Sequence, residues 1–257
     1  MSDQLYIPDC IRQKIGTKGY QTDTIGRSSA AILFFDNLVL KIEEDNEESA
    51  AEHTMLAWLQ GKLPVPELVV SHLEDGRRYL LMSRVEGEMA CSDPCLSRPE
   101  ALVSLLADAL RLFWSVDPAG CPRCNDLDHK LRRAQHLIDN GLVDTASAEP
   151  QTFGRGGFFG PQALLDYLKE NRPPQELCLT HGDFCLPNLF FRGGRVSGFI
   201  DLGRSGLADR WQDIALCVRS LRYNLQSDAY TGLFFETLGL PYDAERVRYF
   251  VLLDELF

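Results

Sequence analysis

The apolar segments change in kind part-way along the chain, and this change limits the fold more than any other feature. Up to about residue 84 the apolar runs are short and end at turn residues such as Asp75-Gly76, which is typical of strands joined by hairpins. After Gly87 the apolar residues recur at the spacing of amphipathic helices. A chain of 257 residues divided in this way is expected to form a small sheet beside a larger helical part.

The first part is expected to be an antiparallel sheet that carries one helix. The strand candidates are residues 28–35, residues 37–42 and two segments within residues 63–87. Between them, Ala51, Met55 and Leu59 repeat at helical spacing after an acidic entry, and Gly61 closes the helix.

The second part is expected to be mainly helical, with a short hairpin that carries polar residues. The helix candidates are residues 98–116, 127–142, 161–171, 209–225 and 245–257. We therefore predict an α+β, bilobal architecture, with a sheet lobe at 1–86 and a helical lobe at 87–257. The cleft between two such lobes is a natural ligand site.

The charge of the chain narrows the choice of partners. With 26 Lys and Arg against 37 Asp and Glu, the net charge is −11, which disfavours nucleic acid and anionic membranes and suits a cationic ligand. No apolar run reaches the roughly 20 residues of a membrane span. The first residues lack a basic segment followed by an apolar one, so we expect a cytoplasmic protein.

The eight cysteines are scattered and are expected to be reduced thiols. The one alternative is a zinc site made by Cys91, Cys95, Cys121 and Cys124, with His129 downstream. The 25 residues between the two cysteine pairs exceed the usual spacing of such sites, which favours free thiols.

The stretch LTHGDFCLPNLFF at 179–191 holds the strongest chemical signal. Asp183 follows an apolar run, Asn188 comes five residues later, and Asp201 ends the next apolar run. Phosphoryl transfer needs a carboxylate that orients the attacking hydroxyl and oxygen ligands that hold Mg²⁺ against the phosphates. Protein kinases use this order of Asp, Asn and a second Asp followed by an apolar residue and Gly.

A cation for the nucleotide phosphates is also present. Lys41 ends the strand segment LVLK, and the acidic helix that follows carries Glu52. A strand lysine paired with a helical glutamate is the arrangement by which kinases position the phosphates. Together with Asp183, Asn188 and Asp201, these residues predict a kinase active site.

Longer segments resemble the aminoglycoside 3'-phosphotransferases, the kanamycin kinases, which have a protein-kinase-like fold. The matching segments are HGDFCLPN, GFIDLGRSGLADRWQDIALCVRS, LLDELF, WLQGKLPVPE and LLMSRVEG, and the resemblance runs from about residue 20 to the last residue. It implies transfer of the γ-phosphate of ATP or GTP, with Mg²⁺, to an aminoglycoside such as kanamycin or neomycin, which confers resistance.

The resemblance also implies a role for each matched residue. Asp183 would be the catalytic base, Asn188 and Asp201 the Mg²⁺ ligands, Lys41 the phosphate contact and Glu52 its partner. Ser28 would cover the β-phosphate, and Met82 and Ser83 would meet the adenine edge. His181, Arg204 and Asp213 would support the active-site loop. Arg219, Asp254, Glu255 and the carboxylate of Phe257 would lie at the substrate.

The sequence departs from the family pattern at three places. Val39 stands where an aromatic often stacks on adenine, so the choice between ATP and GTP stays open. Residues 146–160 contain one acid, Glu149, and Tyr223 stands where an acid is expected. Two other readings follow: a kinase of this fold that acts on another amine or sugar alcohol, and a non-catalytic nucleotide-binding module.

Overall fold

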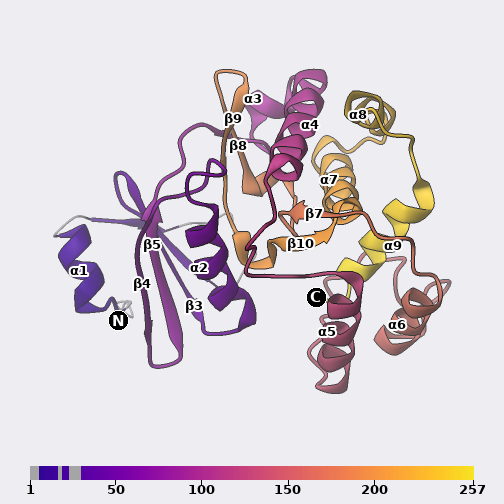
Figure 1. Ribbon diagram of the computed structural model, residues 1–257, viewed down its shortest axis with the longest axis horizontal. Helices are drawn as coiled ribbons and strands as arrows, with labels where there is room; N and C mark the ends of the chain where they lie inside the picture. The colour runs from indigo at the N-terminus through magenta and orange to yellow at the C-terminus, as the bar shows by residue number, and fades with distance from the viewer. Residues whose placement is uncertain (1–5, 17–18, 23–29) are drawn as a thin grey trace.

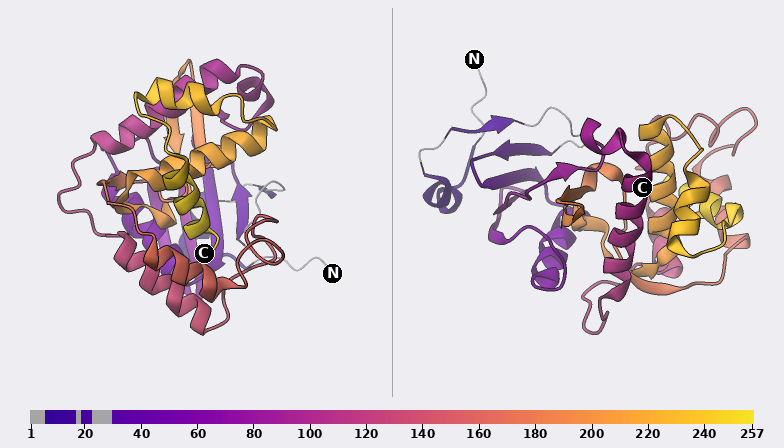
Figure 2. Two further views of the ribbon diagram at one scale, coloured as in Figure 1. Left: turned by 90° about the vertical axis from the view of Figure 1, so that its right-hand side faces the viewer. Right: turned by 90° about the horizontal axis from the view of Figure 1, so that it is seen from above.

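The computed structural model describes residues 6–16, 19–22 and 30–257. Its sheet part and its helical part lie side by side (Figures 1 and 2). The predicted α+β, bilobal fold is therefore confirmed. Ser28, which we expected at the nucleotide, lies outside the described residues.

The N-terminal sheet has five strands in the order β1-β2-β3-β5-β4, and every neighbouring pair is antiparallel. The strands are β1 (Gln21–Thr22), β2 (Ala31–Phe34), β3 (Leu38–Glu44), β4 (Leu68–Glu74) and β5 (Arg77–Ser83). The predicted turn between β4 and β5 is present. Asp75 and Gly76 both have positive φ, at 49° and 72°, which suits the backbone twist of a tight hairpin.

Two helices cover opposite faces of this sheet (Figure 1). On β5, Leu80 and Met82 pack into the main core with α2 (Glu47–Leu59), whereas Tyr79 and Leu81 pack with α1 (Asp9–Ile15). Strand residues alternate between faces, so both faces of β5 are buried. The prediction of one helix in this lobe was therefore incomplete. The four-residue spacing of Ile7, Ile11 and Ile15 was the signal for α1.

The chain after residue 87 folds around α4 (Pro99–Ser115), whose apolar face is fully buried. The other helices are α3 (Asp93–Leu96), α5 (Leu127–Asp139), α6 (Pro161–Glu170), α7 (Arg210–Leu225), α8 (Thr231–Leu238) and α9 (Ala244–Asp254), with the 3-10 turns η1 (Leu186–Asn188) and η2 (Leu202–Arg204). The strands are β6 (Glu88–Met89), β7 (Leu177–Thr180), β8 (Leu189–Arg192), β9 (Arg195–Phe199) and β10 (Gly206–Asp209). We did not predict α3, α8, β6 or β10.

The chain passes from one part to the other near residue 87. β6 is the first element after this point, and it already pairs with β8 of the second part. A division into 1–86 and 87–257 stays our proposal. Over the residues that the structure describes, no helix is both long and apolar enough to cross a membrane.

Candidate active site

Two strand pairs bring the polar residues of the motif to one place. β7 pairs with β10, and β8 pairs with β9, so the loop after β7 and the turn after β9 meet. The contact is direct: the N–H of Ile200 donates to the carbonyl of Asn188 at 3.0 Å. Asp201 therefore lies next to Asn188, although thirteen positions separate them in the sequence.

Asp183 and Asn188 form one hydrogen-bonded unit. The side-chain amide of Asn188 donates to the carbonyl of Asp183 at 3.0 Å and to its carboxylate Oδ2 at 3.1 Å. The other oxygen, Oδ1, accepts from the thiol of Cys185 at 3.0 Å. Both carboxylate oxygens of Asp183 thus have a donor.

The backbone before Asp183 is held by Asp213 of α7. The carboxylate of Asp213 is fully buried and accepts the N–H groups of His181 at 2.7 Å and Gly182 at 2.8 Å. Gly182 has φ +86°, and a Cβ at this position would lie 2.0 Å from the carbonyl oxygen of Arg204. Only glycine fits here. The ring of His181 lies 3.0 Å from the carbonyl oxygen of Ile200, which joins the two loops.

Lys41 on β3 lies among three carboxylates. Its ammonium is 2.7 Å from Glu52 Oε2, 3.1 Å from Asp201 Oδ1 and 3.4 Å from Glu43 Oε2. Burial alone would lower the pKa of Lys41, but the charges of Glu52, Asp201 and Glu43 outweigh it, so the pKa is raised. The lysine therefore stays positively charged beside Asp201.

The turn that begins at Asp201 is fixed from the sheet lobe. Asp201 has a left-handed backbone, with φ 59° and ψ 61°, which is uncommon outside glycine and asparagine. The next N–H, that of Leu202, donates to Glu52 Oε1 at 3.3 Å. Glu52 thus joins Lys41 to the turn that follows Asp201. Gly203 packs closely on α2, since a Cβ there would lie 2.9 Å from the carbonyl oxygen of Glu48.

Met82 and Ser83 lie at the end of β5, where the chain leaves the sheet. The N–H of Ser83 donates to the carbonyl of Glu67 at 2.9 Å, and its hydroxyl accepts from the N–H of Glu67 at 2.8 Å. Val39 on β3 is the register partner of Met82. An aliphatic residue therefore lies where the family pattern suggested an aromatic.

The acidic residues at the chain end have arginine partners that we did not predict from the sequence. Asp254 forms ion pairs with Arg204, at 3.3 Å, and with Arg219. Glu255 lies 3.4 Å from Arg219 and also accepts the N–H of Glu149 at 2.9 Å. The predicted substrate carboxylates Asp254 and Glu255 are therefore already paired.

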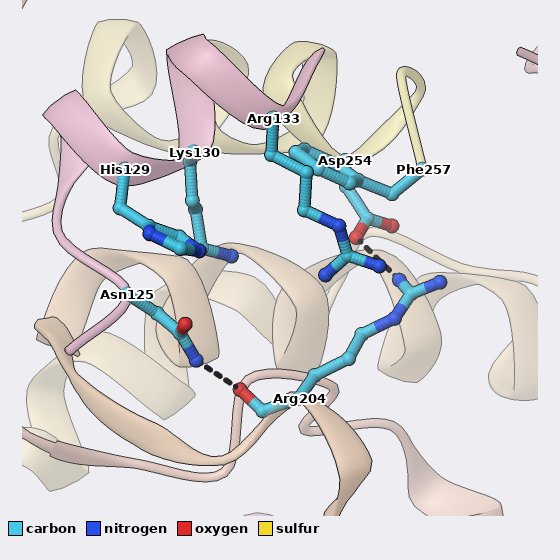
Figure 3. Close-up of a pocket in the computed structure, with 7 residues that line it drawn as sticks. All are labelled: Asn125, His129, Lys130, Arg133, Arg204, Asp254 and Phe257. Atoms are coloured by element: carbon cyan, nitrogen blue, oxygen red, sulfur yellow. Dashed lines mark hydrogen bonds and ion pairs between the residues drawn. The ribbon is translucent and has the colours of Figure 1, made fainter. Parts of the chain in front are cut away.

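Asp254 and Phe257 also line a small cavity beside α5 (Figure 3). Its volume is about 10 Å³, roughly the room for one water molecule. The ring of Phe257 lies 5.6 Å from the ammonium of Lys130 and 5.4 Å from the guanidinium carbon of Arg133. Burial lowers the pKa of Lys130 to about 7, and Asp254 opposes this shift.

Sequence reasoning missed three residues that contact the loops of the site. They are Cys185, Gln212, which donates to the carbonyl of Gly182 at 2.8 Å, and Glu48, which accepts from Arg204 at 3.1 Å. Cys185 stands inside the motif, so its position was a usable signal. The other two contacts depend on how α7 and α2 pack.

The cysteines considered for zinc are free thiols in the structure. Within residues 6–16, 19–22 and 30–257, no three His, Cys, Asp or Glu side chains gather in a way that could hold a metal ion. The zinc alternative therefore has no geometric support among the described residues.

A comparison with family models decides the membership of the chain. The model of the phosphotransferase enzyme family, APH, matches residues 21–250. The chain belongs to this family. It is therefore a phosphotransferase.

This phosphotransferase has relatives that align along nearly their whole length. It is 41% identical over 248 residues to an aminoglycoside 3'-phosphotransferase of Enterococcus faecalis, which covers 91% of this chain and 92% of the relative. It is also 41% identical over 247 residues to the enzyme of the same name from Staphylococcus aureus, with the same coverage.

Solved structures show the same fold. Aminoglycoside phosphotransferase APH(3'')-Id from Streptomyces rimosus superposes with a TM-score of 0.81 at 26% identity, over 96% of this chain and 95% of that chain. The same enzyme has been solved in complex with ADP and streptomycin, with a TM-score of 0.78 at 25% identity, over 96% of this chain and 95% of that chain.

Proposed function

We propose that the protein is an aminoglycoside 3'-O-phosphotransferase that transfers the γ-phosphate of ATP or GTP and confers resistance to its acceptor. The observation that carries the proposal is the 41% identity, over 91% of the chain, to enzymes named for this reaction. The fold by itself does not fix the acceptor position, because structural neighbours are named for the 3'' and the 3' position.

In this proposal Asp183 is the catalytic base. Its carboxylate orients the acceptor hydroxyl and takes its proton as the hydroxyl oxygen bonds to the γ-phosphorus. The bond between that phosphorus and the β,γ-bridging oxygen breaks, and the nucleoside diphosphate leaves. The charge of Lys41, which is held by Glu52, faces the phosphates and favours the negative charge that the leaving group gains.

Asn188 and Asp201 suit Mg²⁺. The amide nitrogen of Asn188 is turned toward Asp183, so the amide oxygen points the other way, and the carboxylate of Asp201 is half exposed. Two hard oxygen ligands are what Mg²⁺ requires in kinase sites, where substrate phosphates and water complete the coordination. When bound, Mg²⁺ would offset phosphate charge during transfer.

The acceptor is proposed to be a polycation. Asp254 and Glu255 lie at the chain end, and the chain as a whole carries −11, so an aminoglycoside is attracted even though the two carboxylates already have arginine partners. The proposal includes a cytoplasmic location, because nucleoside triphosphates are kept there.

The test is a coupled kinase assay with kanamycin and tobramycin, each with ATP and with GTP. Kanamycin is expected to be phosphorylated, and tobramycin, which lacks the 3'-hydroxyl, is expected to bind without turnover. Phosphorus NMR of the kanamycin product locates the new ester. Phosphorylation of tobramycin at a comparable rate contradicts the 3' assignment. Turnover only with other amines or sugar alcohols contradicts the acceptor class.

A further inference from the structure

The thiol of Cys185 lies against the residue that we propose as the base. Sγ of Cys185 is 3.0 Å from Oδ1 of Asp183, and the N–H of Cys185 also donates to the carbonyl of Asp183, at 2.8 Å. Cys185 also contacts Asn188, because the N–H of Asn188 donates to the carbonyl of Cys185 at 3.0 Å. Backbone and side chain of Cys185 therefore both contact Asp183.

The two oxygens of the Asp183 carboxylate accept hydrogen bonds from two different residues. Oδ1 accepts from Cys185, and Oδ2 accepts from the amide of Asn188 at 3.1 Å. Rotation about the last torsion of an aspartate is otherwise broad, because its energy wells are shallow. With one donor on each oxygen, rotation in either direction breaks a hydrogen bond. The pair of donors thus fixes the plane of the carboxylate.

The thiol of Cys185 is protonated and can therefore donate a hydrogen bond. Burial raises the pKa of its thiol well above the usual value, and the charge of Asp183 and the hydrogen bond to it act in the same direction. The thiol therefore keeps its proton at neutral pH. Since a thiolate beside Asp183 would repel the carboxylate, the protonated form is the one that this geometry requires.

The peptide around Cys185 is held in place by α7. The N–H of Leu186 donates to the hydroxyl of Ser220 at 2.9 Å, and the side chains of Phe184 and Leu186 are fully buried. Sγ of Cys185 is thus presented from a fixed backbone. A thiol is a weak hydrogen-bond donor. Because this thiol is already held at hydrogen-bond distance, little conformational entropy is lost when it orients Asp183.

We propose that Cys185 is a positioning residue for phosphoryl transfer: its S–H holds the Asp183 carboxylate in the plane in which it meets the acceptor hydroxyl. The inference rests on the proposed function, since it assumes that Asp183 is the base. It assigns to Cys185 no contact with substrate and no covalent step.

The experiment compares Cys185→Ser with Cys185→Ala. Serine and alanine are close in size, but only serine keeps a donor, so the difference between them isolates the hydrogen bond from packing. Cys185→Ala is expected to lower kcat by about threefold to tenfold, the effect of one modest hydrogen bond, with little change in either KM. Cys185→Ser is expected to retain most of the kcat of the unmodified protein.

Cys178→Ala serves as the matched control, because Cys178 is another partly buried thiol and lies on β7. The kcat of the Cys178→Ala variant is expected to be unchanged. Thermal unfolding of all variants identifies any general loss of structure. Equal kcat values for the serine and alanine variants overturn the proposal, as does a change confined to KM. If the unmodified protein does not phosphorylate kanamycin at all, the proposed function fails, and this outcome is distinct from the first.

Discussion

Asp254 and Arg219 form an ion pair at the chain end, and Arg204 contacts the same carboxylate from the other side at 3.3 Å. The carboxylate of Asp254 is therefore shared between two guanidinium groups, only one-tenth of it is exposed, and it links the turn after Asp201 to α7 and α9. A substrate ammonium that binds Asp254 joins an existing charge cluster.

Substitution of Asp254 tests this shared role. Asp254→Asn is expected to raise KM for kanamycin by about tenfold or more, because a charge-assisted contact is lost and two arginines then face the ammonium groups. KM for the nucleotide is expected to stay nearly constant. Steady-state kinetics with each substrate varied in turn measures both.

Glu245→Gln is the matched control for this change, since Glu245 is an exposed acid on the same helix, α9. It removes the same net charge from the protein. If Glu245→Gln and Asp254→Asn raise the KM for kanamycin equally, the effect is one of net charge. An unaltered KM in Asp254→Asn would show that the carboxylate serves only as a counter-ion for Arg204 and Arg219.

Asp183→Asn tests the catalytic base. The substitution keeps the size of the side chain and removes its ability to take a proton, so kcat is expected to fall by about 100-fold or more. Nucleotide affinity, measured by calorimetry with a non-hydrolysable analogue, is expected to change little. Substantial turnover by a folded Asp183→Asn protein would be incompatible with the assigned role.

Asp201→Asn tests the metal site with little backbone strain. Asp201 has φ 59°, and asparagine tolerates this left-handed conformation, whereas alanine is strained there. The loss of a charged Mg²⁺ ligand is expected to reduce turnover to background, while the melting temperature changes little. Excess chelator should abolish turnover by the unmodified protein, and activity that persists in chelator would exclude a divalent cation.

The residues that we propose for the chemistry were easier to predict than the contacts that hold them. Asp183, Asn188 and Asp201 carry a spacing that phosphoryl transfer requires, so they could be chosen from the sequence. The partners of Asp254 could not be chosen, because Arg219 comes to it through the packing of α7 against α9, and Arg204 comes to it from η2. Long-range charge pairing leaves no periodic trace in a sequence.

Short elements were the other limit. α3 has four residues, below the length at which helical periodicity is distinct, and α1, with seven, offered only the spacing of Ile7, Ile11 and Ile15. β10 is only four residues long and lies within a segment that reads as the entry to α7. Its existence depends on pairing with β7, a tertiary contact.

The pair of Lys41 and Glu52 leads to a prediction about stability. The side chains of Lys41 and Glu52 are 12% and 4% exposed, so Lys41→Met leaves a buried carboxylate without its nearest partner. Loss of one member of such a pair is expected to lower the free energy of unfolding by about 3 kcal/mol. The double variant Lys41→Met/Glu52→Gln is expected to recover part of this loss, because Glu52, the least exposed of the three carboxylates around Lys41, is then neutral.

The pH dependence of Lys41→Met follows from the same pair. The pKa of Lys41 is higher in the folded protein than in the unfolded chain, where it is about 10.4. The contribution of charged Lys41 to the free energy of unfolding is therefore fully present below this unfolded-state pKa. It is lost only as pH rises through the higher pKa of the folded state. Burial raises the pKa of Glu52, so without Lys41 this carboxyl takes up a proton more readily as pH falls. The destabilisation by Lys41→Met is therefore expected to be smaller at about pH 5 than at about pH 8.

Urea unfolding of the two variants and of the unmodified protein at both pH values measures these differences. Lys169→Met, which removes an exposed lysine of α6, is the control and is expected to change stability little at either pH. Two results together would contradict this account: Lys41→Met is as stable as the double variant, and its loss of stability is the same at both pH values. Lys41 would then not be what keeps Glu52 ionised. Other contacts, such as the hydrogen bond from Arg204 to Glu48, must then hold the turn after Asp201 to the sheet lobe.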